Sequence, residues 1–474
     1  MRAIGLGWLV CGVVVAVSAS AWAHGGRPVP RKIYVDPDNS DNQALVSSDL
    51  GLHVTSDGGQ SWFWICEDIV GFDVQTFALA GRSGGAPADR VWLAGGIGIT
   101  DGVDAGRYVP GLHRSLDGGC NWAPTEGILA TQWVSSISVD PDDPDKIVVT
   151  TRHLLEPNGI ALSDDAGASW RWSNVEGLNR RLNSLTRAPS DPSILYASST
   201  TELWRSEDGG QTWVSFFAEL LANETDELEV LRVDPEDPDV LYFSLLGLAG
   251  KHLYVTDDGG LTPRKLLEPS GLEFQALSVT VTDDQGGREL LVGDTFGTAF
   301  LSTDLGQTWQ EYLAGIVSIE CLEPTPDDPE ALFVCSNPFA QFIPPIFALG
   351  TTRDKGVTVE PYFSYADTTD YLQCDPDSQI QTVCVALLDV GGDDVGGGED
   401  VGPDGPDAGS PDAGSPDAGS DDLDAGGLDA GSPPPPRPAD CACATARGTA
   451  PAAPWWALGA ILAARVVRRR GRRA

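Results

Sequence analysis

The central part of the chain, residues 31–390, consists of short hydrophobic runs separated by turns that are rich in glycine, aspartate and proline. A representative stretch contains the runs Ile194–Ser199, Glu202–Ser206 and Trp213–Phe217. Short runs rich in β-branched and aromatic side chains, with Gly or Asp between them, are typical of β-strands joined by hairpins. No long hydrophobic pattern with the 3.6-residue period of a helix interrupts them. The pattern therefore predicts an all-β fold.

One eight-residue motif recurs between these runs: a hydroxyl residue, any residue, Asp, any residue, Gly, any residue, a small polar residue and Trp. Five copies keep every key position, and they begin at Thr55, Ser115, Ser163, Ser206 and Ser302. Two further copies begin at Thr256 and Thr352 and have Pro263 and Val359 in place of Trp. The starting positions lie 43 to 60 residues apart, close to the period of about 40 to 50 residues that is typical of propeller blades. We therefore predict a single β-propeller of seven four-stranded blades over residues 24–388.

The motif has a local structural explanation. Asp can accept hydrogen bonds from backbone amides of its own turn, Gly supplies the positive φ of a tight hairpin, and the hydroxyl can cap a nearby backbone group. The Trp, expected to begin the outer strand, can bury about 200 Å² at about 25 cal/mol/Å². Because every unit repeats these residues, we interpret them as structural groups rather than ligands. They are Asp57, Trp62, Asp117, Trp122, Asp165, Trp170, Asp208, Trp213, Asp258, Asp304, Trp309 and Asp354.

The seven copies resemble the Asp-box, or BNR, repeat of sialidases, sortilin-type receptors, xyloglucanases and photosystem-assembly-factor-like propellers. This resemblance implies a β-propeller but no particular reaction, because one fold hosts many functions. The Arg-Ile-Pro sequence of sialidases is missing, and Arg27-Pro28 and Arg31-Lys32-Ile33 are poor substitutes. Xyloglucanase-type enzymes place catalysis between two propellers, whereas this chain has the length for one. We therefore favour a non-catalytic propeller that recognises a protein or polysaccharide partner. A secreted glycoside hydrolase with an axial active site is the alternative.

The two ends of the chain carry targeting patterns. Residues 1–23 run from Arg2 through an apolar stretch to Ala21-Trp22-Ala23, which is typical of a secretory signal peptide; an uncleaved anchor is the alternative. Residues 389–440 lack aromatic side chains and repeat Ser-Pro-Asp-Ala-Gly. Such a composition cannot bury enough apolar surface to fold, so it predicts a disordered, extended acidic spacer.

Residues 441–474 begin with Cys441-Ala442-Cys443, continue through an apolar segment and end in an arginine cluster. This order resembles the myxobacterial C-terminal sorting signal, MYXO-CTERM. The resemblance implies processing by sorting machinery near Cys441 or Cys443, lipid attachment there, and display at the outer membrane. A permanent transmembrane anchor is the alternative. We therefore expect an exported protein that is held at the cell surface.

Charge and histidine spacing exclude further classes of partner. The formal net charge of −39 repels a phosphate backbone, so we expect no nucleic-acid binding. None of the five histidines stands in a recognisable metal-ligand spacing. We therefore expect neither a metal nor a cofactor.

The predicted propeller contains six cysteines: Cys66, Cys120, Cys321, Cys335, Cys374 and Cys384. An even number in an exported protein predicts disulfides, and six cysteines allow about 15 connectivities. Proximity along the chain favours Cys321 with Cys335 and Cys374 with Cys384, which leaves Cys66 with Cys120. Residues 372–390 contain two further strand-like runs, which either close the ring or begin an extra blade.

Overall fold

The computed structural model describes residues 29–47, 51–70, 74–81, 90–96, 111–153, 158–173, 181–216, 227–247, 250–267, 274–282, 287–294, 296–316, 318–325, 327–337, 346–368 and 370–385. The chain divides into two units, residues 1–398 and 399–474, and every described residue belongs to the first. The predicted signal peptide, spacer and sorting tail, with Cys441 and Cys443, lie outside the described residues. No helix of the described ranges is long and apolar enough to cross a membrane.

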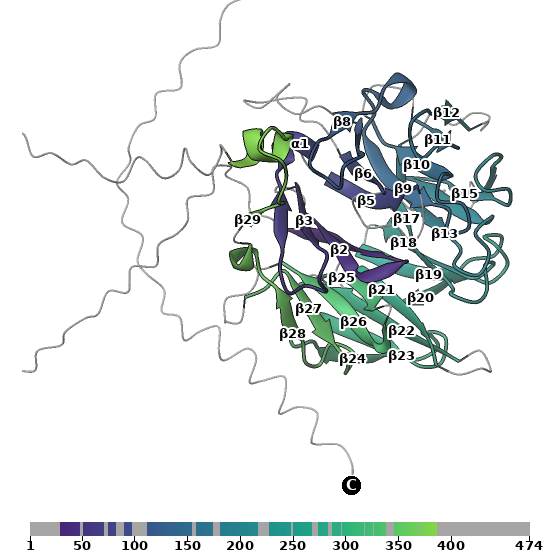
Figure 1. Ribbon diagram of the computed structural model, residues 1–474. Coiled ribbons are helices and arrows are strands. Elements are labelled where there is room, and N and C mark those ends of the chain that lie inside the picture. The colour runs from purple at the N-terminus through teal and green to yellow at the C-terminus, as the bar shows by residue number, and fades with distance from the viewer. Residues whose placement is uncertain are drawn as a thin grey trace, which may run out of the picture. The chain divides into compact units, whose positions relative to one another are not determined.

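Seven blades of four antiparallel strands follow one another around a ring and form a seven-bladed β-propeller, and the sheet of blade 1 gains a fifth strand from the end of the described chain (Figure 1). This confirms the predicted all-β fold. Blades 1 to 4 are formed by β1 (Pro30–Asp36), β2 (Asn39–Ser47), β3 (Gly51–Thr55) and β4 (Phe63–Ile65); β5 (Val74–Ala80), β6 (Val91–Gly96), β7 (Gly111–Ser115) and β8 (Ala123–Pro124); β9 (Val134–Val139), β10 (Ile147–Thr151), β11 (Ile160–Ser163) and β12 (Arg171–Trp172); and β13 (Leu182–Arg187), β14 (Leu195–Ser199), β15 (Leu203–Ser206) and β16 (Val214–Phe216).

Blades 5 to 7 repeat the arrangement with β17 (Glu227–Val233), β18 (Leu241–Gly247), β19 (Gly250–Thr256) and β20 (Arg264–Leu267); β21 (Phe274–Val281), β22 (Arg288–Asp294), β23 (Thr298–Ser302) and β24 (Gln310–Leu313); and β25 (Ile319–Thr325), β26 (Asp328–Ser336), β27 (Leu349–Thr352) and β28 (Glu360–Phe363). Helical structure in the described ranges is limited to α1 (Glu67–Val70), the 3₁₀ turns η2 (Gly127–Leu129) and η3 (Tyr365–Asp367), and the π-helical turn η4 (Ile380–Cys384).

The repeated motif marks the same turn in every blade. Each third strand ends at the hydroxyl residue that begins a motif, from Thr55 in blade 1 to Thr352 in blade 7. The sequence predicted that Trp begins the fourth strand. In the five complete copies this strand begins one residue after Trp. The indole N–H groups of Trp122 and Trp213 donate to glycine carbonyl oxygens of the turn at 2.8 and 2.9 Å. In these two copies the Trp side chain is therefore hydrogen-bonded within its own turn, whereas the indole N–H of Trp309 donates to the Leu266 carbonyl oxygen of the preceding blade at 3.1 Å.

Side-chain packing joins blade 7 to blade 1. The ring centroids of Trp62 and Phe363 lie 4.7 Å apart, and the Tyr362 hydroxyl donates to the Gly58 carbonyl oxygen at 2.7 Å. Gly59 has a φ of +83°, and a Cβ atom there would lie 2.5 Å from the Tyr362 ring. This interface therefore requires glycine at position 59 for both backbone conformation and space.

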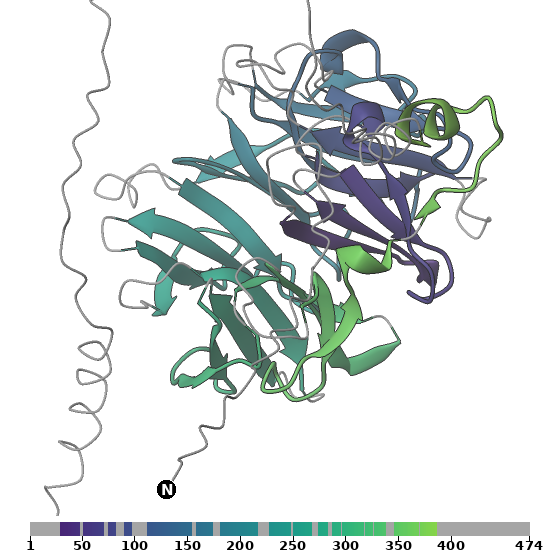
Figure 2. The same cartoon turned by 90° about the vertical axis from the view of Figure 1, so that its left-hand side faces the viewer.

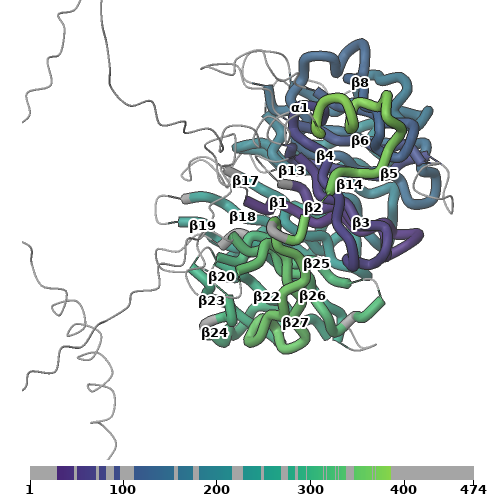
Figure 3. Tube along the Cα trace, turned by 60° about the vertical axis from the view of Figure 1, so that its left-hand side comes forward, coloured from purple at the N-terminus to yellow at the C-terminus, as the bar shows by residue number. Residues whose placement is uncertain are grey.

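After blade 7 the chain crosses onto blades 1 and 2 (Figures 2 and 3). The strand β29 (Asp370–Tyr371) pairs in parallel with β4, at the outer edge of blade 1. The turn η4 follows, and the segment 370–385 contains no further strand. The segment therefore extends the sheet of blade 1 and does not begin an extra blade, because its backbone pairs with the outer edge of that sheet. We call residues 370–385 the latch.

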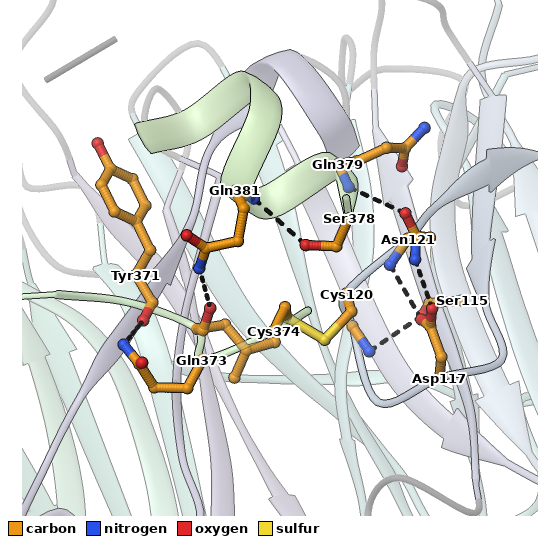
Figure 4. Close-up of a disulfide and its surroundings, with 12 residues drawn as sticks. Ser115, Asp117, Cys120, Asn121, Tyr371, Gln373, Cys374, Ser378, Gln379 and Gln381 are labelled. Atoms are coloured by element: carbon orange, nitrogen blue, oxygen red, sulfur yellow. Dashed lines mark hydrogen bonds between the residues drawn. A yellow bond between two sulfur atoms is a disulfide. The ribbon is translucent and has the colours of Figure 1, made fainter. Parts of the chain in front are cut away.

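Two disulfides fix the latch to the ring. Cys384 is bonded to Cys66, which follows β4, and Cys374 is bonded to Cys120 in the motif turn of blade 2 (Figure 4). The Gln379 backbone N–H donates to Asn121 Oδ1 at 2.9 Å beside the second bridge. The latch is thus covalently bonded to both blades.

One of the three expected cysteine pairs is confirmed. Cys321 and Cys335 lie opposite each other on β25 and β26 and are bonded. The expected pairs Cys374–Cys384 and Cys66–Cys120 are wrong. Closure of the ring brings the end of the chain onto the first two blades, so distance in sequence does not decide the partners.

Ion pairs join neighbouring blades at the turns that follow three of the innermost strands. Each acidic member stands in a Val-Asp-Pro sequence and accepts a hydrogen bond from the backbone N–H two residues later. Each arginine belongs to the next blade along the chain. The pairs are Asp36–Arg90 at 2.7 Å, Asp140–Arg187 at 3.2 Å and Asp234–Arg288 at 2.6 Å. The repeated Val-Asp-Pro pattern marks the acidic member of each pair in the sequence, whereas the arginine partners, 47 to 54 positions away, are not marked by any local pattern.

Candidate functional site

The motif aspartates make the same contacts in all seven turns. In blade 1, Asp57 Oδ1 accepts hydrogen bonds from the Thr55 hydroxyl at 2.8 Å and from the Ser61 N–H at 2.9 Å. Asp57 Oδ2 accepts from the Ser61 hydroxyl at 2.5 Å, and Thr55 Oγ1 accepts from the Gly59 N–H at 3.0 Å. In the other six turns the hydroxyl lies 2.6 to 3.1 Å from Asp Oδ1.

These contacts occupy both oxygens of each carboxylate. The copies at Asp258 and Asp354 keep the network although they lack Trp. Hydrogen bonds from Ser61 lower the pKa of Asp57, and those from Thr308 lower the pKa of Asp304 to about 2. The motifs lie one per blade, between the two outer strands, so the structure does not bring their aspartates together. This geometry supports the turn and offers no shared ligand site.

The innermost strands of the seven blades surround a polar channel of about 340 Å³. Blades 2 to 4 line it with hydroxyl and amide side chains, namely Gln75, Thr76, Ser135, Ser136, Asn183, Ser184 and Thr186. Blades 5, 7 and 1 line it with charged side chains, namely Glu229, Arg232, Glu320, Glu323, Arg31 and Lys32. The axial channel therefore has a neutral hydrogen-bonding side and a charged side.

The three carboxylates of the channel are all engaged by other protein groups. Glu323 lies 2.6 Å from Arg232, and Glu229 lies 3.5 Å from Lys251. Glu320 accepts a hydrogen bond from the Ser318 hydroxyl. The carboxylates are thus held in place by the protein.

Two cations of the channel have no such partner. Within the described part of the chain, neither Arg31 nor Lys32 forms a side-chain hydrogen bond or an ion pair. The Lys32 side chain is exposed to water in the channel, but the surrounding protein removes part of its hydration. This desolvation lowers the pKa of Lys32, while the attraction of Glu323 raises it to a smaller extent. In the sequence, Arg31-Lys32-Ile33 is only a poor match to a sialidase motif, because no local pattern shows which strand edge faces the axis.

A second cavity, of about 380 Å³, lies between blades 1 and 2. Tyr34, Phe77 and Trp92 line it, together with Leu372 of the latch. A Cβ atom on Gly119 would lie 3.1 Å from Leu372. The latch therefore packs against blade 2 at this interface and forms part of the cavity wall.

No cluster of His, Cys, Asp and Glu in the described ranges is arranged to hold a metal ion. His53 and His113, which line neither cavity, are buried, and burial lowers their pKa values to about 3 and about 4.

Comparisons with known proteins agree on the propeller. No family model matches the chain. A xyloglucanase from Paenibacillus sp. is 25% identical over 256 residues, a match that covers 50% of this chain and 22% of that enzyme. The crystal structure of the GH74 xyloglucanase from Xanthomonas campestris has a TM-score of 0.51 and 16% identity, and the match covers 72% of this chain and 54% of that chain.

YCF48 from Cyanidioschyzon merolae aligns with a TM-score of 0.45 at 15% identity, covering 66% of this chain and 93% of that chain. The chain spans about a fifth of the curated xyloglucanase and about half of the solved one. At such identities the solved xyloglucanase shows a likeness of fold alone.

Proposed function

We propose that this protein is an exported, surface-held β-propeller that binds a polysaccharide in its axial channel without cleaving it. The observation that carries the proposal is the engagement of all three channel carboxylates by Arg232, Lys251 and Ser318. A typical glycoside hydrolase needs a carboxylic acid to protonate the leaving group and a second carboxylate to act as base or nucleophile. Glu323 and Glu229 face cations and Glu320 faces a hydroxyl, so the described channel offers no pair of carboxylates without protein partners for these two roles.

The neutral side of the channel favours a polysaccharide over a protein ligand. Hydroxyl and amide groups can each donate and accept hydrogen bonds, which matches the many hydroxyls of a sugar. Ser136 and Thr186 illustrate this side, since neither side chain has a hydrogen-bond partner in the described ranges. An apolar, aromatic surface would instead favour a protein partner.

The ends of the chain support surface display in this proposal. The signal-like residues 1–23 export the protein, and the Asp-box-like propeller is held away from the membrane by the acidic spacer 389–440. Processing at Cys441 or Cys443 attaches it to the outer membrane. Replacing both cysteines by serine is expected to release the protein or leave an unprocessed precursor. Surface retention with unchanged mass in that variant would contradict the anchoring proposal.

A glycoside hydrolase is the second candidate, and the similarity to the Paenibacillus xyloglucanase favours it. The deciding experiment incubates the purified full-length chain with insoluble polysaccharides, xyloglucan included, and measures both retention and new reducing ends. The proposal predicts retention without new reducing ends. Release of reducing ends that is lost in Glu320→Gln or Glu323→Gln would establish the hydrolase instead. Recovery of a protein partner without polysaccharide retention would also overturn the proposal.

A further inference from the structure

We infer that the axial channel binds the carboxylate of an acidic sugar, a hexuronate unit, through Arg31 and Lys32, while the sugar hydroxyls contact the neutral side of the channel. This inference rests on the proposed function and specifies its ligand class. It follows from the charges and hydrogen-bond partners of the channel-lining side chains.

The charges of the channel leave the two cations of β1 available. With Lys251, which pairs with Glu229, the channel has four cations against three carboxylates. Arg232 is paired with Glu323 and also donates to the Leu322 carbonyl oxygen at 2.7 Å. Arg31 and Lys32 remain without a partner in the described ranges. Because Glu320 has only the neutral Ser318 hydroxyl as its partner among the described residues, the charges of the channel sum to +1, and the two cations without a partner are adjacent on β1.

The Lys32 side chain is exposed to the water of the channel, so an incoming carboxylate can reach its ammonium group. The surrounding protein removes enough of the hydration of Lys32 to lower its pKa, and charge-assisted hydrogen bonds to a carboxylate would replace that hydration. The net charge of −39 does not prevent this, since charges beyond about 8 Å are largely screened at physiological ionic strength.

The opposite side of the channel supplies the hydrogen bonds that a bare anion would not use. The hydroxyls of Ser136 and Thr186 are unpartnered in the described ranges, and Asn183 donates a single long hydrogen bond, to the Leu228 carbonyl oxygen at 3.4 Å. A ligand that carries one carboxylate and several hydroxyls satisfies both sides. The volume of about 340 Å³ lies at the small end of the range of about 300 to 1,000 Å³ for ligand pockets.

The test is isothermal titration calorimetry on the full-length chain with glucuronate, glucose and acetate. Glucuronate is expected to bind at least tenfold more tightly than either of the others, because only glucuronate uses both sides of the channel. Arg31→Gln and Lys32→Gln are each expected to weaken glucuronate binding at least tenfold, whereas Lys32→Arg keeps most of it. Arg171→Gln, which removes an exposed cation paired with Asp164, is the matched control and is expected to bind as the wild type does.

Thermal unfolding separates a binding role from a structural one. Lys32→Gln removes an unpartnered charge, so its midpoint temperature is expected to equal or exceed that of the wild type while glucuronate binding is lost. Equal affinity for glucose and glucuronate, or unchanged binding in both Gln variants, would overturn the inference. Tighter binding of an N-acetylated dipeptide carboxylate than of glucuronate would also overturn it, because the ligand would then be a peptide end.

One further ligand, a galacturonate trimer, distinguishes the source of the uronate. Binding of both glucuronate and a galacturonate trimer supports recognition of a polysaccharide unit, and binding of the monomer alone supports a free sugar acid. Retention of neutral polysaccharides with no uronate binding would end this inference and leave the proposed function standing. Glucuronate binding without retention of any polysaccharide would end the proposed function instead.

Discussion

Removal of the two latch disulfides is predicted to destabilise the ring by a large, calculable amount. Apart from these bridges, Tyr371 pairs with the edge of blade 1 and Gln379 bonds to the turn of blade 2. Tyr371 also stacks on Trp64, and Ile380 is buried in the hydrophobic cluster of blades 1 and 2. The bridges add to these non-covalent contacts through the loops that they close. The perturbation is the double substitution Cys120→Ser with Cys374→Ser, alone or combined with Cys66→Ser and Cys384→Ser.

The magnitude follows from the loop that each bridge closes in the unfolded chain. With Cys66–Cys384 intact, the Cys120–Cys374 bridge closes a ring made of residues 66–120 and 374–384, about 64 residues, which corresponds to about 4 kcal/mol. Removing both bridges also frees the loop of sequence separation 318 and brings the upper limit to about 10 kcal/mol. Such a loss is comparable with the whole stability of a typical domain, about 5–15 kcal/mol.

The assay combines urea unfolding of the full-length chain with chymotrypsin digestion. Tyr371 is 3% exposed, so cleavage there reports opening of the latch. The Cys120→Ser, Cys374→Ser variant is expected to lose about 4 kcal/mol and to become cleavable beside Tyr371. The matched control removes the bridge within blade 7, Cys321–Cys335, which closes a separation of 14 residues and costs about 3 kcal/mol. The control is expected to resist cleavage at the latch.

One result would refute this reasoning. If the latch variant lost less than about 1 kcal/mol and resisted chymotrypsin as the wild type does, packing between blades 7 and 1 would be sufficient to close the ring. The latch would then be an attachment to the ring and not part of its closure.

Three further predictions concern the ring itself. Gly59→Ala is expected to cost at least about 2 kcal/mol more than Gly209→Ala in urea unfolding, because both glycines have positive φ but only the first faces a ring 2.5 Å away. Arg288→Ala is expected to lower the free energy of unfolding by about 3 kcal/mol, because it leaves the buried carboxylate of Asp234 without its cation. Arg171→Ala removes an exposed ion pair and is expected to lower it by less than about 1 kcal/mol. Burial lowers the pKa of His53 from 6.5 in the unfolded chain to about 3 in the folded protein. Its contribution to the stability of the folded state is therefore fully present above pH 6.5 and is lost as the pH falls toward 3. His53→Leu is expected to make the unfolding temperature less dependent on pH in this range.

Each of these three predictions has a result that would contradict it. Equal losses for the two glycine variants would mean that the tyrosine of blade 7 moves aside at little cost. Equal losses for the two arginine variants would mean that the buried pair between blades 5 and 6 contributes no more than a surface pair. A pH profile unchanged by the histidine substitution would assign the acid sensitivity to other groups, such as His113 or the motif aspartates.

The blade architecture could be predicted from the sequence because its determinants are local. The hydroxyl, Asp and Gly of each motif satisfy one another within a single turn, as Thr55, Asp57 and Gly59 do. Each third strand ends at the first residue of a motif, including the copy at Thr352 that lacks Trp. Hydrogen bonds between residues within five positions of each other form without contacts to the rest of the chain.

Features that depend on ring closure could not be predicted in this way. Residues 372–377 resembled a first strand, but blade 7 already packs against blade 1, and the segment lies against blades 1 and 2 instead. The partners of Cys66 and Cys120 followed from that placement and not from spacing. The channel was missed for the same reason, because Lys32 and Glu323 lie 291 positions apart and meet only when β1 and β25 lie side by side.

The most direct test of recognition in the axial channel is a polysaccharide array probed in parallel with the full-length wild type and with the double variant Arg31→Gln, Lys32→Gln. We predict that the wild type is retained on uronate-containing polysaccharides without releasing fragments, and that the double variant is retained at least tenfold less while unfolding at the same temperature. Identical retention of the two proteins, or fragments released by the wild type, would contradict the account.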